Sequence, residues 1–306
     1  MQNIAFVFSG QGAQYSGMGK ELYEASFSAK KVFDIADSIR KGTSEQCFFG
    51  TSEELMQTAN TQPCLYCVDL AAAQALSQEG IIPSAAAGFS LGEIAALTFC
   101  KILSEEDGFK LVCKRGELMQ KAALEHDSVM AAVLKMDNQA VENICEKYDN
   151  VYPVNYNSPG QLVVAGLKEE MELFKADIKQ AGGRVVPLNV SGGFHTPFMK
   201  KASEGLETEI NKYTLNSPQI PIYSNYTAKP YGENIKELII NQIKNPVKWQ
   251  ETVENMILDG IDTFIEVGAG KTLSGLIGKI SQDVKIFNVE DKASLKNTIE
   301  ALKEAR

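Results

Sequence analysis

Gly88-Phe89-Ser90-Leu91-Gly92 is a G-x-S-x-G pentapeptide that ends an apolar run and begins an amphipathic one. Residues 81–87 before it predict a short buried strand, and residues 93–99 after it predict a helix. A sharp turn between a strand and a helix is the geometry of a nucleophile elbow, in which flanking glycines let the serine hydroxyl project above the sheet edge. Ser90 is therefore a candidate nucleophile, and the alternative interpretation is a glycine-flanked turn without chemistry.

A serine nucleophile needs a base, and the chain contains only two histidines, His126 and His195. His195 follows a glycine-rich turn, whereas His126 lies in a polar stretch at a predicted helix end, where a histidine serves as a cation near the helix dipole. His195 is the better candidate to accept the Ser90 proton and return it to the leaving group. No aspartate stands out as a third triad member, so a backbone carbonyl is an alternative partner for the imidazole.

The middle of the chain predicts a separate small domain with the ferredoxin-like order β-α-β-β-α-β. Its expected elements are strand 129–135, helix 138–148, strand 151–157, strand 161–165, helix 168–180 and strand 184–190. Such a unit returns the chain close to where it left, which suits insertion into a larger domain. We expect residues 127–191 to form this small domain, and residues 1–126 and 192–306 to form one discontinuous catalytic domain.

The outer segments predict an α/β fold. Short apolar strands at 4–8, 82–87 and 263–267 alternate with helical stretches, which fits a mainly parallel sheet covered by helices on both faces. The stretch GAGKT at 268–272 resembles the end of a phosphate-binding P-loop, but that motif requires a glycine where this chain has Ile265. We therefore expect an ordinary connection between a strand and a helix there.

Composition argues against several classes of partner. The 306-residue chain is 44% hydrophobic and 23% charged, as in ordinary globular proteins, and its net charge is −9. This acidic balance disfavours nucleic acid or an anionic membrane surface as the main partner. No run approaches the ~18 apolar residues of a membrane span. Residues 1–8 lack the basic start of a signal peptide, so we expect a cytoplasmic location.

Six cysteines include Cys64-x-x-Cys67, a spacing that also occurs in metal and redox sites. No second Cys or His pair follows at zinc spacing, and the helical pattern over residues 63–78 places Cys64, Cys67 and Ala71 on one apolar face. Free cysteine behaves as a small hydrophobic residue. The sequence therefore predicts a structural role for these thiols and no metal site.

Arg115 falls within the apolar stripe of a predicted helix. Residues 104–107 predict its capped start, and Val112, Met119 and Ala122 recur around Arg115 at helical spacing. A guanidinium on the inward face must find an anion, because burying it unpaired costs too much free energy. The residues alone leave two partners open, namely one of the 39 acidic side chains in an internal salt bridge or the carboxylate of a substrate.

Six stretches along nearly the whole chain carry the motifs of one family in the same order and spacing. They are FSGQGAQ at 8–14, GFSLGE at 88–93, KRGELMQ at 114–120, GFH at 193–195, QIKNPVKW at 242–249 and EVG at 266–268. Together they resemble the malonyl-CoA:acyl carrier protein transacylases, including the discrete acyltransferases of polyketide pathways. The resemblance implies an α/β-hydrolase-like large domain that carries a ferredoxin-like insertion, in agreement with the reading above.

The resemblance also implies the roles of the site residues. Ser90 is expected to be the acylated nucleophile and His195 its base. The main-chain N–H groups of Gln11 and Leu91 are expected to form the oxyanion hole. Arg115 is expected to hold the malonyl carboxylate, which then becomes the better of its two possible partners.

Two further positions follow from the same resemblance. Gln242 is expected beside the catalytic histidine, with its main-chain carbonyl orienting the ring. One residue departs from the family pattern, because the family usually has histidine directly before the serine and this chain has Phe89. The chain therefore lacks any hydrogen bond that this histidine supplies, while it keeps the nucleophile, the base and the arginine.

The implied activity is that of an S-malonyltransferase of the EC 2.3.1 class. We expect it to move a malonyl group from malonyl-CoA to the phosphopantetheine thiol of an acyl carrier protein, without a metal or a cofactor beyond the coenzyme A thioester. Two alternatives stay open: a serine acyl hydrolase or thioesterase that uses Ser90 and His195 on water, and a scaffold with an inactive site. The sequence does not decide between fatty-acid and polyketide synthesis.

Overall fold

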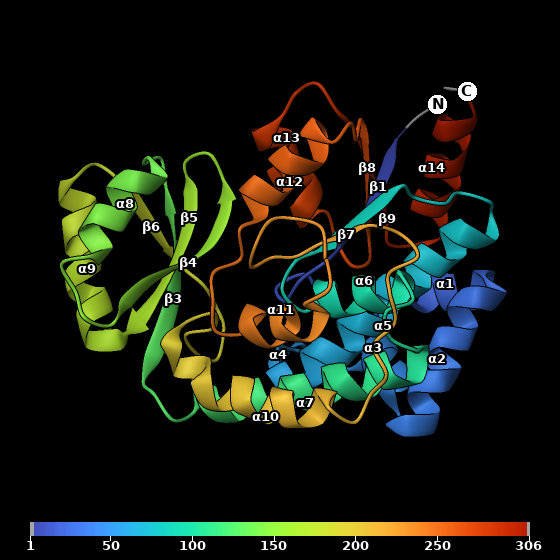
Figure 1. The fold of residues 1–306 in the computed structure, drawn as a ribbon, viewed down its shortest axis with the longest axis horizontal. Coiled ribbons are helices and arrows are strands. Elements are labelled where there is room, and N and C mark those ends of the chain that lie inside the picture. Colours follow the sequence, from blue (N-terminus) through green and yellow to red (C-terminus); the bar gives the residue numbers. More distant parts are fainter. Residues whose placement is uncertain (1–2, 305–306) are drawn as a thin grey trace.

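Five strands form a central parallel sheet in the computed structural model, which describes residues 3–304 (Figure 1). They are β1 (Ile4–Phe8), β2 (Ala85–Gly88), β7 (Ile222–Tyr223), β8 (Thr263–Val267) and β9 (Lys285–Val289). The sheet order is β7-β2-β1-β8-β9, and every pairing is parallel. Residues 1–2, which belong to the stretch that lacks signal-peptide character, lie outside the described residues.

Helices cover both faces of this sheet (Figure 1). They are α1 (Lys20–Ala25), α2 (Phe27–Ile39), α3 (Thr43–Phe49), α4 (Ser52–Met56), α5 (Thr58–Gln78), α6 (Gly92–Phe99), α7 (Glu105–Ala123), the 3₁₀ turn η1 (Pro197–Met199), α10 (Lys200–Ile210), α11 (Ile235–Gln242), α12 (Trp249–Leu258), α13 (Thr272–Ile280) and α14 (Lys292–Glu304). Phe6 and Phe8 of β1 share a core with α5 and α6, whereas Ala5 and Val7 share one with α12 and α13. A strand buried on both faces must be apolar throughout, as β1 is.

The second sheet is antiparallel and contains β3 (Ser128–Leu134), β4 (Val151–Ser158), β5 (Gln161–Leu167) and β6 (Arg184–Pro187) in the order β4-β5-β3-β6. Its helices α8 (Asn138–Cys145) and α9 (Lys168–Gln180) lie on the outer face of this sheet (Figure 1). Ala131 and Val133 pack against those helices, and Met130 and Ala132 join the core of the large domain, as the two-residue period of a strand requires.

The α/β prediction, with a mainly parallel sheet and a βαββαβ unit, is confirmed. Some details differ: the strand before the elbow begins at Ala85 rather than at residue 81, because Pro83 has no N–H to donate to a sheet ladder. The sequence also did not predict β7, with only two residues, or β9 at the sheet edge. The boundaries at 127 and 191 stay a prediction.

The parallel register brings the carboxyl ends of the strands together at one edge of the sheet. Phe8 at the end of β1 aligns with Gly88 on one side and Val267 on the other. The segments that follow these strands therefore emerge side by side, and in open α/β sheets ligands bind at this edge. Gln11 follows β1 and Ser90 follows β2 at this edge.

Ser90 sits in the sharp turn that the pentapeptide predicts. Its φ is +54°, a left-handed conformation that non-glycine residues adopt only where the surroundings enforce it. A Cβ on Gly88 would lie 2.1 Å from the main chain of Gly92, and a Cβ on Gly92 would lie 2.4 Å from the carbonyl oxygens of Phe8 and Ser9. Both glycines are required because β1, the elbow and α6 approach one another so closely.

The GAGKT stretch is the loop between β8 and α13, as expected. The buried carboxylate of Glu266 accepts hydrogen bonds from the N–H groups of Leu273 (2.9 Å) and Ser274 (2.7 Å). The N-terminus of α13 therefore already donates to a carboxyl group of the chain itself, at the position where a P-loop helix would offer its N–H groups to phosphate.

The close approach at Gly92 yields a stability prediction. Gly92→Ala should lower the free energy of unfolding by about 1–3 kcal/mol, because the new methyl group overpacks against main-chain oxygens that cannot move independently. Gly275→Ala is the matched control: it adds the same methyl group at an exposed position of α13, where nothing lies within 4 Å, and should raise stability by about 0.5–1 kcal/mol. Thermal and denaturant unfolding measure both; equal effects would contradict the steric account.

Candidate active site

The structure brings Ser90 and His195 together from positions 105 residues apart in the sequence. Ser90 lies between β2 and α6, and His195 lies in the loop between β6 and η1. Ser90 Oγ and His195 Nε2 are 2.8 Å apart. His195 is almost fully buried and also has a positive φ, +60°, so both partners occupy strained backbone conformations.

Two backbone carbonyls orient the imidazole, and no aspartate among residues 3–304 hydrogen-bonds to it. His195 Nδ1 lies 3.0 Å from the carbonyl oxygen of Gln242 and 3.2 Å from that of Asn245. Carbonyl oxygens only accept hydrogen bonds, so Nδ1 carries the proton and Nε2 is left to accept from Ser90. Burial, reinforced by the nearby Arg115 cation, lowers the pKa of His195 to about 4. The imidazole is thus neutral at physiological pH and ready to act as a base.

Arg115 lies on α7 with its side chain fully buried beside the serine. One terminal nitrogen donates to Gln62 Oε1 (2.7 Å), and the other donates to Gln242 Oε1 (2.8 Å) and Ser90 Oγ (3.2 Å). Its Nε is buried without a partner within residues 3–304. Burial lowers the pKa of Arg115 to about 10, so the side chain remains a cation at neutral pH.

The internal salt bridge that the sequence left open for Arg115 is absent from the part of the chain that the structure describes. No Asp or Glu among residues 3–304 lies within ion-pair distance of the guanidinium, and all of its hydrogen-bond acceptors are neutral oxygens. A buried cation held only by neutral groups favours an anionic ligand.

Asn225 forms hydrogen bonds to two residues of the elbow, and the sequence did not indicate it as a site residue. Its Oδ1 accepts from the Ser90 N–H (2.7 Å), and its Nδ2 donates to the Gly88 carbonyl (2.6 Å). Asn225 follows β7, so it reaches the same sheet edge as Ser90. A sequence-based prediction of β7 could have indicated Asn225, because this residue follows that strand. Gln62, whose Oε1 accepts a hydrogen bond from Arg115, was not predicted because it lies within a helix that is buried on nearly all sides.

The N–H groups expected to form the oxyanion hole are available for a ligand. Within residues 3–304, neither the Gln11 N–H nor the Leu91 N–H donates to a protein acceptor. The Ser90 N–H, by contrast, is already bound by Asn225. Gln11 follows β1 and Leu91 directly follows Ser90, so both come from the sheet edge at which the serine lies.

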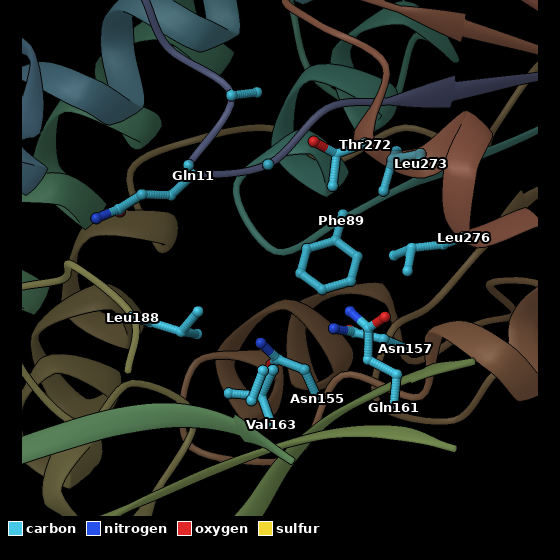
Figure 2. Close-up of a pocket in the computed structure, with 14 residues that line it drawn as sticks. Gln11, Phe89, Asn155, Asn157, Gln161, Val163, Leu188, Thr272, Leu273 and Leu276 are labelled. Carbon is cyan, nitrogen blue, oxygen red and sulfur yellow. The ribbon is translucent and has the colours of Figure 1, made fainter. Parts of the chain in front are cut away.

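A cavity of about 240 Å³ lies between the two domains next to this edge. Figure 2 shows Phe89 projecting into it between Leu273 and Leu276 of α13 and Asn155 and Asn157 of β4. The Oδ1 atoms of both asparagines are buried and lack a protein partner in the described part of the chain. The cavity therefore combines an apolar wall with unsatisfied polar atoms, as a ligand site does. Phe89 also packs edge-on against Trp249, with ring centroids 5.6 Å apart.

The remaining sequence candidates lie apart from this chemistry. His126 stacks on the Phe198 ring, with centroids 4.7 Å apart. Cys64 and Cys67 are buried free thiols, and burial raises the pKa of Cys67 well above its usual value. Residues 3–304 contain no group of three or more His, Cys, Asp or Glu side chains arranged to hold a metal. No helix in the same range is long and apolar enough to span a bilayer.

Comparison with known proteins agrees with this geometry. The acyl transferase domain family matches residues 5–289. Malonyl CoA-acyl carrier protein transacylase of Bacillus subtilis (strain 168) is 39% identical, with 99% of this chain and 98% of the relative covered. The crystal structure of the transacylase of that name from Clostridium perfringens superposes with a TM-score of 0.96 at 41% identity, covering 99% of this chain and 98% of the other.

A second solved structure shows an enzyme of this kind with its partner. It is a malonyl-transacylase in complex with a holo type II polyketide acyl-carrier protein, and the matched chain has a TM-score of 0.94 at 34% identity, covering 98% of this chain and 100% of the other. Relatives of this similarity along nearly the full length, together with the nucleophile elbow and its histidine, lead to one assignment: the chain belongs to the acyl transferase family, among the malonyl-CoA:acyl carrier protein transacylases.

Proposed function

We propose that this chain transfers a malonyl group from malonyl-CoA to the phosphopantetheine thiol of an acyl carrier protein through a malonyl-Ser90 intermediate. One observation carries the proposal: Ser90 Oγ lies 2.8 Å from a neutral imidazole and 3.2 Å from a buried guanidinium that has no carboxylate partner within residues 3–304. The first neighbour activates the hydroxyl, and the second recognises a second carboxyl group on the acyl chain.

In the first half-reaction, Ser90 Oγ attacks the thioester carbonyl while His195 Nε2 accepts the hydroxyl proton. The negative charge that forms on the carbonyl oxygen is stabilised by the N–H groups of Gln11 and Leu91. Collapse of the tetrahedral intermediate breaks the C–S bond. The imidazolium then returns its proton to the departing coenzyme A thiolate.

In the second half-reaction, the thiol of the carrier protein replaces coenzyme A. His195 accepts the thiol proton as the sulfur attacks the malonyl ester, and the same two N–H groups stabilise the oxyanion. The C–O bond to Ser90 then breaks, and the serine oxygen takes the proton back from the imidazolium. The enzyme ends in its starting state.

Arg115 provides selectivity for a dicarboxylic acyl group. Its planar guanidinium offers several donors, which within residues 3–304 bind neutral oxygens or have no partner. A malonyl carboxylate can accept two parallel charge-assisted hydrogen bonds from such a group. Gln242 assists by accepting from Arg115 with its side chain while its main-chain carbonyl orients His195.

The proposal extends to cofactors, location and partners. The reaction needs no metal and no cofactor beyond the coenzyme A thioester, and a cytoplasmic location stays our prediction. Relatives include an enzyme bound to a polyketide carrier, so both fatty-acid and polyketide carriers are candidate acceptors. The rival serine hydrolase would consume malonyl-CoA equally with and without carrier protein, whereas a transferase needs the carrier for turnover.

The nucleophile and the base have distinct expected effects. Ser90→Ala should abolish the acyl-enzyme, seen by intact-protein mass after incubation with malonyl-CoA. His195→Ala should slow acylation by ~10²–10⁴, the range for a lost general base. His126→Ala is the control with nearly unchanged rate, since that histidine stacks on Phe198. An essential His126 beside a dispensable His195 would refute the assignment.

Removal of Arg115 should separate dicarboxylic from simple acyl substrates. Arg115→Ala should cost malonyl transfer about 2–5 kcal/mol, as for the loss of one partner of a desolvated charge pair. Acetyl-CoA, which has no second carboxylate, should be used as well as before or better, and Arg115→Lys should fall between. The measurement is kcat/KM for both thioesters, with folding checked by thermal melting. Equal losses on both substrates would make Arg115 a structural residue only.

Phe89 should tolerate the residue that the family usually carries. Phe89→His should change acylation by less than about tenfold, roughly 1.4 kcal/mol of barrier, because the elbow depends on Gly88 and Gly92 rather than on this side chain. Stopped-flow or quenched acylation of the folded variant measures the effect. Complete loss of acylation in a folded Phe89→His protein would show that the ring does more than pack against Trp249.

A further inference from the structure

Glu93 is a buried carboxylate at the active site that the proposed mechanism does not use. It lies in the first turn of α6, three residues after the nucleophile, and its side chain is 1% exposed. One carboxylate oxygen accepts from Gln242 Nε2 (3.0 Å) and from the Asn225 N–H (3.2 Å). The other accepts from the Tyr231 hydroxyl. Glu93 therefore connects Gln242 with Asn225. Gln242 contacts His195 and Arg115, and Asn225 hydrogen-bonds to the elbow.

These contacts determine which way the Gln242 amide points. Its Nε2 donates to the Ser90 carbonyl (2.6 Å) and to Glu93, and neither an ionised carboxylate nor a carbonyl has a proton to give. The amide nitrogen must face this pair of acceptors. The amide oxygen is thereby directed to Arg115, from which it accepts at 2.8 Å.

Loss of the negative charge on Glu93 would remove this constraint. A protonated or amidated side chain at position 93 can donate as well as accept, so the Gln242 amide could turn over. Its NH₂ group would then face the Arg115 guanidinium, and two donors would oppose each other. The guanidinium would shift away from Ser90, and the segment whose carbonyl orients His195 would lose its anchor.

We propose that Glu93 is a positioning residue for acyl transfer: its ionised carboxylate fixes the Gln242 amide and, through it, the Arg115 guanidinium and the His195 ring. The inference rests on the roles proposed above for Ser90, His195 and Arg115. Glu93 has this role without touching the substrate, since Gln242 lies between its carboxylate and the Arg115 guanidinium.

The charge state of Glu93 changes within an accessible pH range. Burial raises the pKa of Glu93 to about 7, against the opposing effects of Tyr231, Gln242, Asn225 and the Arg115 cation. The groups that face it keep their charge in this range: Arg115 stays cationic and His195 stays neutral. The Tyr231 hydroxyl stays protonated because burial raises its pKa well above the usual value. Asn225 and Gln242 do not titrate.

The sign of the pH effect follows from these states. Below the pKa of Glu93 the carboxyl is protonated and Gln242 is released, so acylation slows as the pH falls. Above that pKa the carboxylate is ionised and the rate reaches its plateau. Tyr231 donates to the ionised form and lowers the pKa of Glu93, so its removal moves the transition to higher pH.

The experiment measures the rate of Ser90 acylation by malonyl-CoA from about pH 5.5 to 8.5, a window around neutrality that contains the transition. It uses the full-length chain and the variants Glu93→Gln and Tyr231→Phe. Wild type should show a transition near neutral pH. Glu93→Gln should be slower by about tenfold or more on the alkaline side and should lack the transition. Tyr231→Phe should reach the wild-type plateau, with its transition moved to higher pH.

One control separates this role from a general effect of lost charge, and a second substrate tests whether His195 is disturbed. Glu169→Gln removes one negative charge at an exposed position of α9 in the small domain and should reproduce the wild-type profile. Acetyl-CoA should lose rate in Glu93→Gln along with malonyl-CoA, because His195 is disturbed as well as Arg115. If Glu93→Gln fails to fold, the displaced transition of Tyr231→Phe still decides the question.

Three results would overturn the inference: a wild-type profile in Glu93→Gln, a transition that persists there, or an unshifted transition in Tyr231→Phe. Intact mass distinguishes this failure from failure of the proposed function. A wild-type enzyme that forms no malonyl-Ser90 contradicts the function itself. Normal acylation with a profile that ignores residue 93 contradicts only the role of Glu93.

Discussion

The buried guanidinium of Arg115 is the constraint on which the rest of the site depends. A cation without solvent is costly, and within residues 3–304 this one donates only to the neutral oxygens of Gln62, Gln242 and Ser90. The negative charge of Glu93 raises the pKa of Arg115, but the Gln242 amide lies between the two side chains. The guanidinium is thus fixed in position without a direct anionic partner within residues 3–304. Such a cation suits a substrate that carries a free carboxylate.

One short segment joins this charge network to His195 and to the inserted domain. The carbonyl oxygens of Gln242 and Asn245 hold the His195 ring. Two residues later, Val247 exchanges main-chain hydrogen bonds with β4 of the small domain, at 2.8 and 2.9 Å. The Lys248 N–H then donates to the Asn225 carbonyl at 2.9 Å. The position of the small domain is therefore tied through a few main-chain bonds to the orientation of the imidazole and to the elbow.

Local patterns predicted much of this molecule. Apolar runs of strand length gave β1 and β8 with their observed bounds, and alternation with helical stretches gave the βαββαβ unit to within a few residues. The elbow was predictable because its glycines are demanded by contacts between neighbouring elements. By contrast, β7 has two residues and no pattern of its own, so Asn225 behind it carried no signal. Glu93 and Gln62 read as ordinary helix residues.

By itself, the sequence indicated Ser90 as the candidate nucleophile, His195 as the better of two candidate bases and an inward-facing arginine, because residue type and local spacing encode these. Only the tertiary structure showed the 2.8 Å contact between Ser90 and His195, the Asn245 carbonyl as a second partner of the imidazole, and that Arg115 has no direct carboxylate partner within residues 3–304. The physical reason is that a hydrogen bond depends on distances of a few ångströms between segments that the parallel register of β1, β2 and β8 brings to one edge. A local sequence pattern does not specify that register.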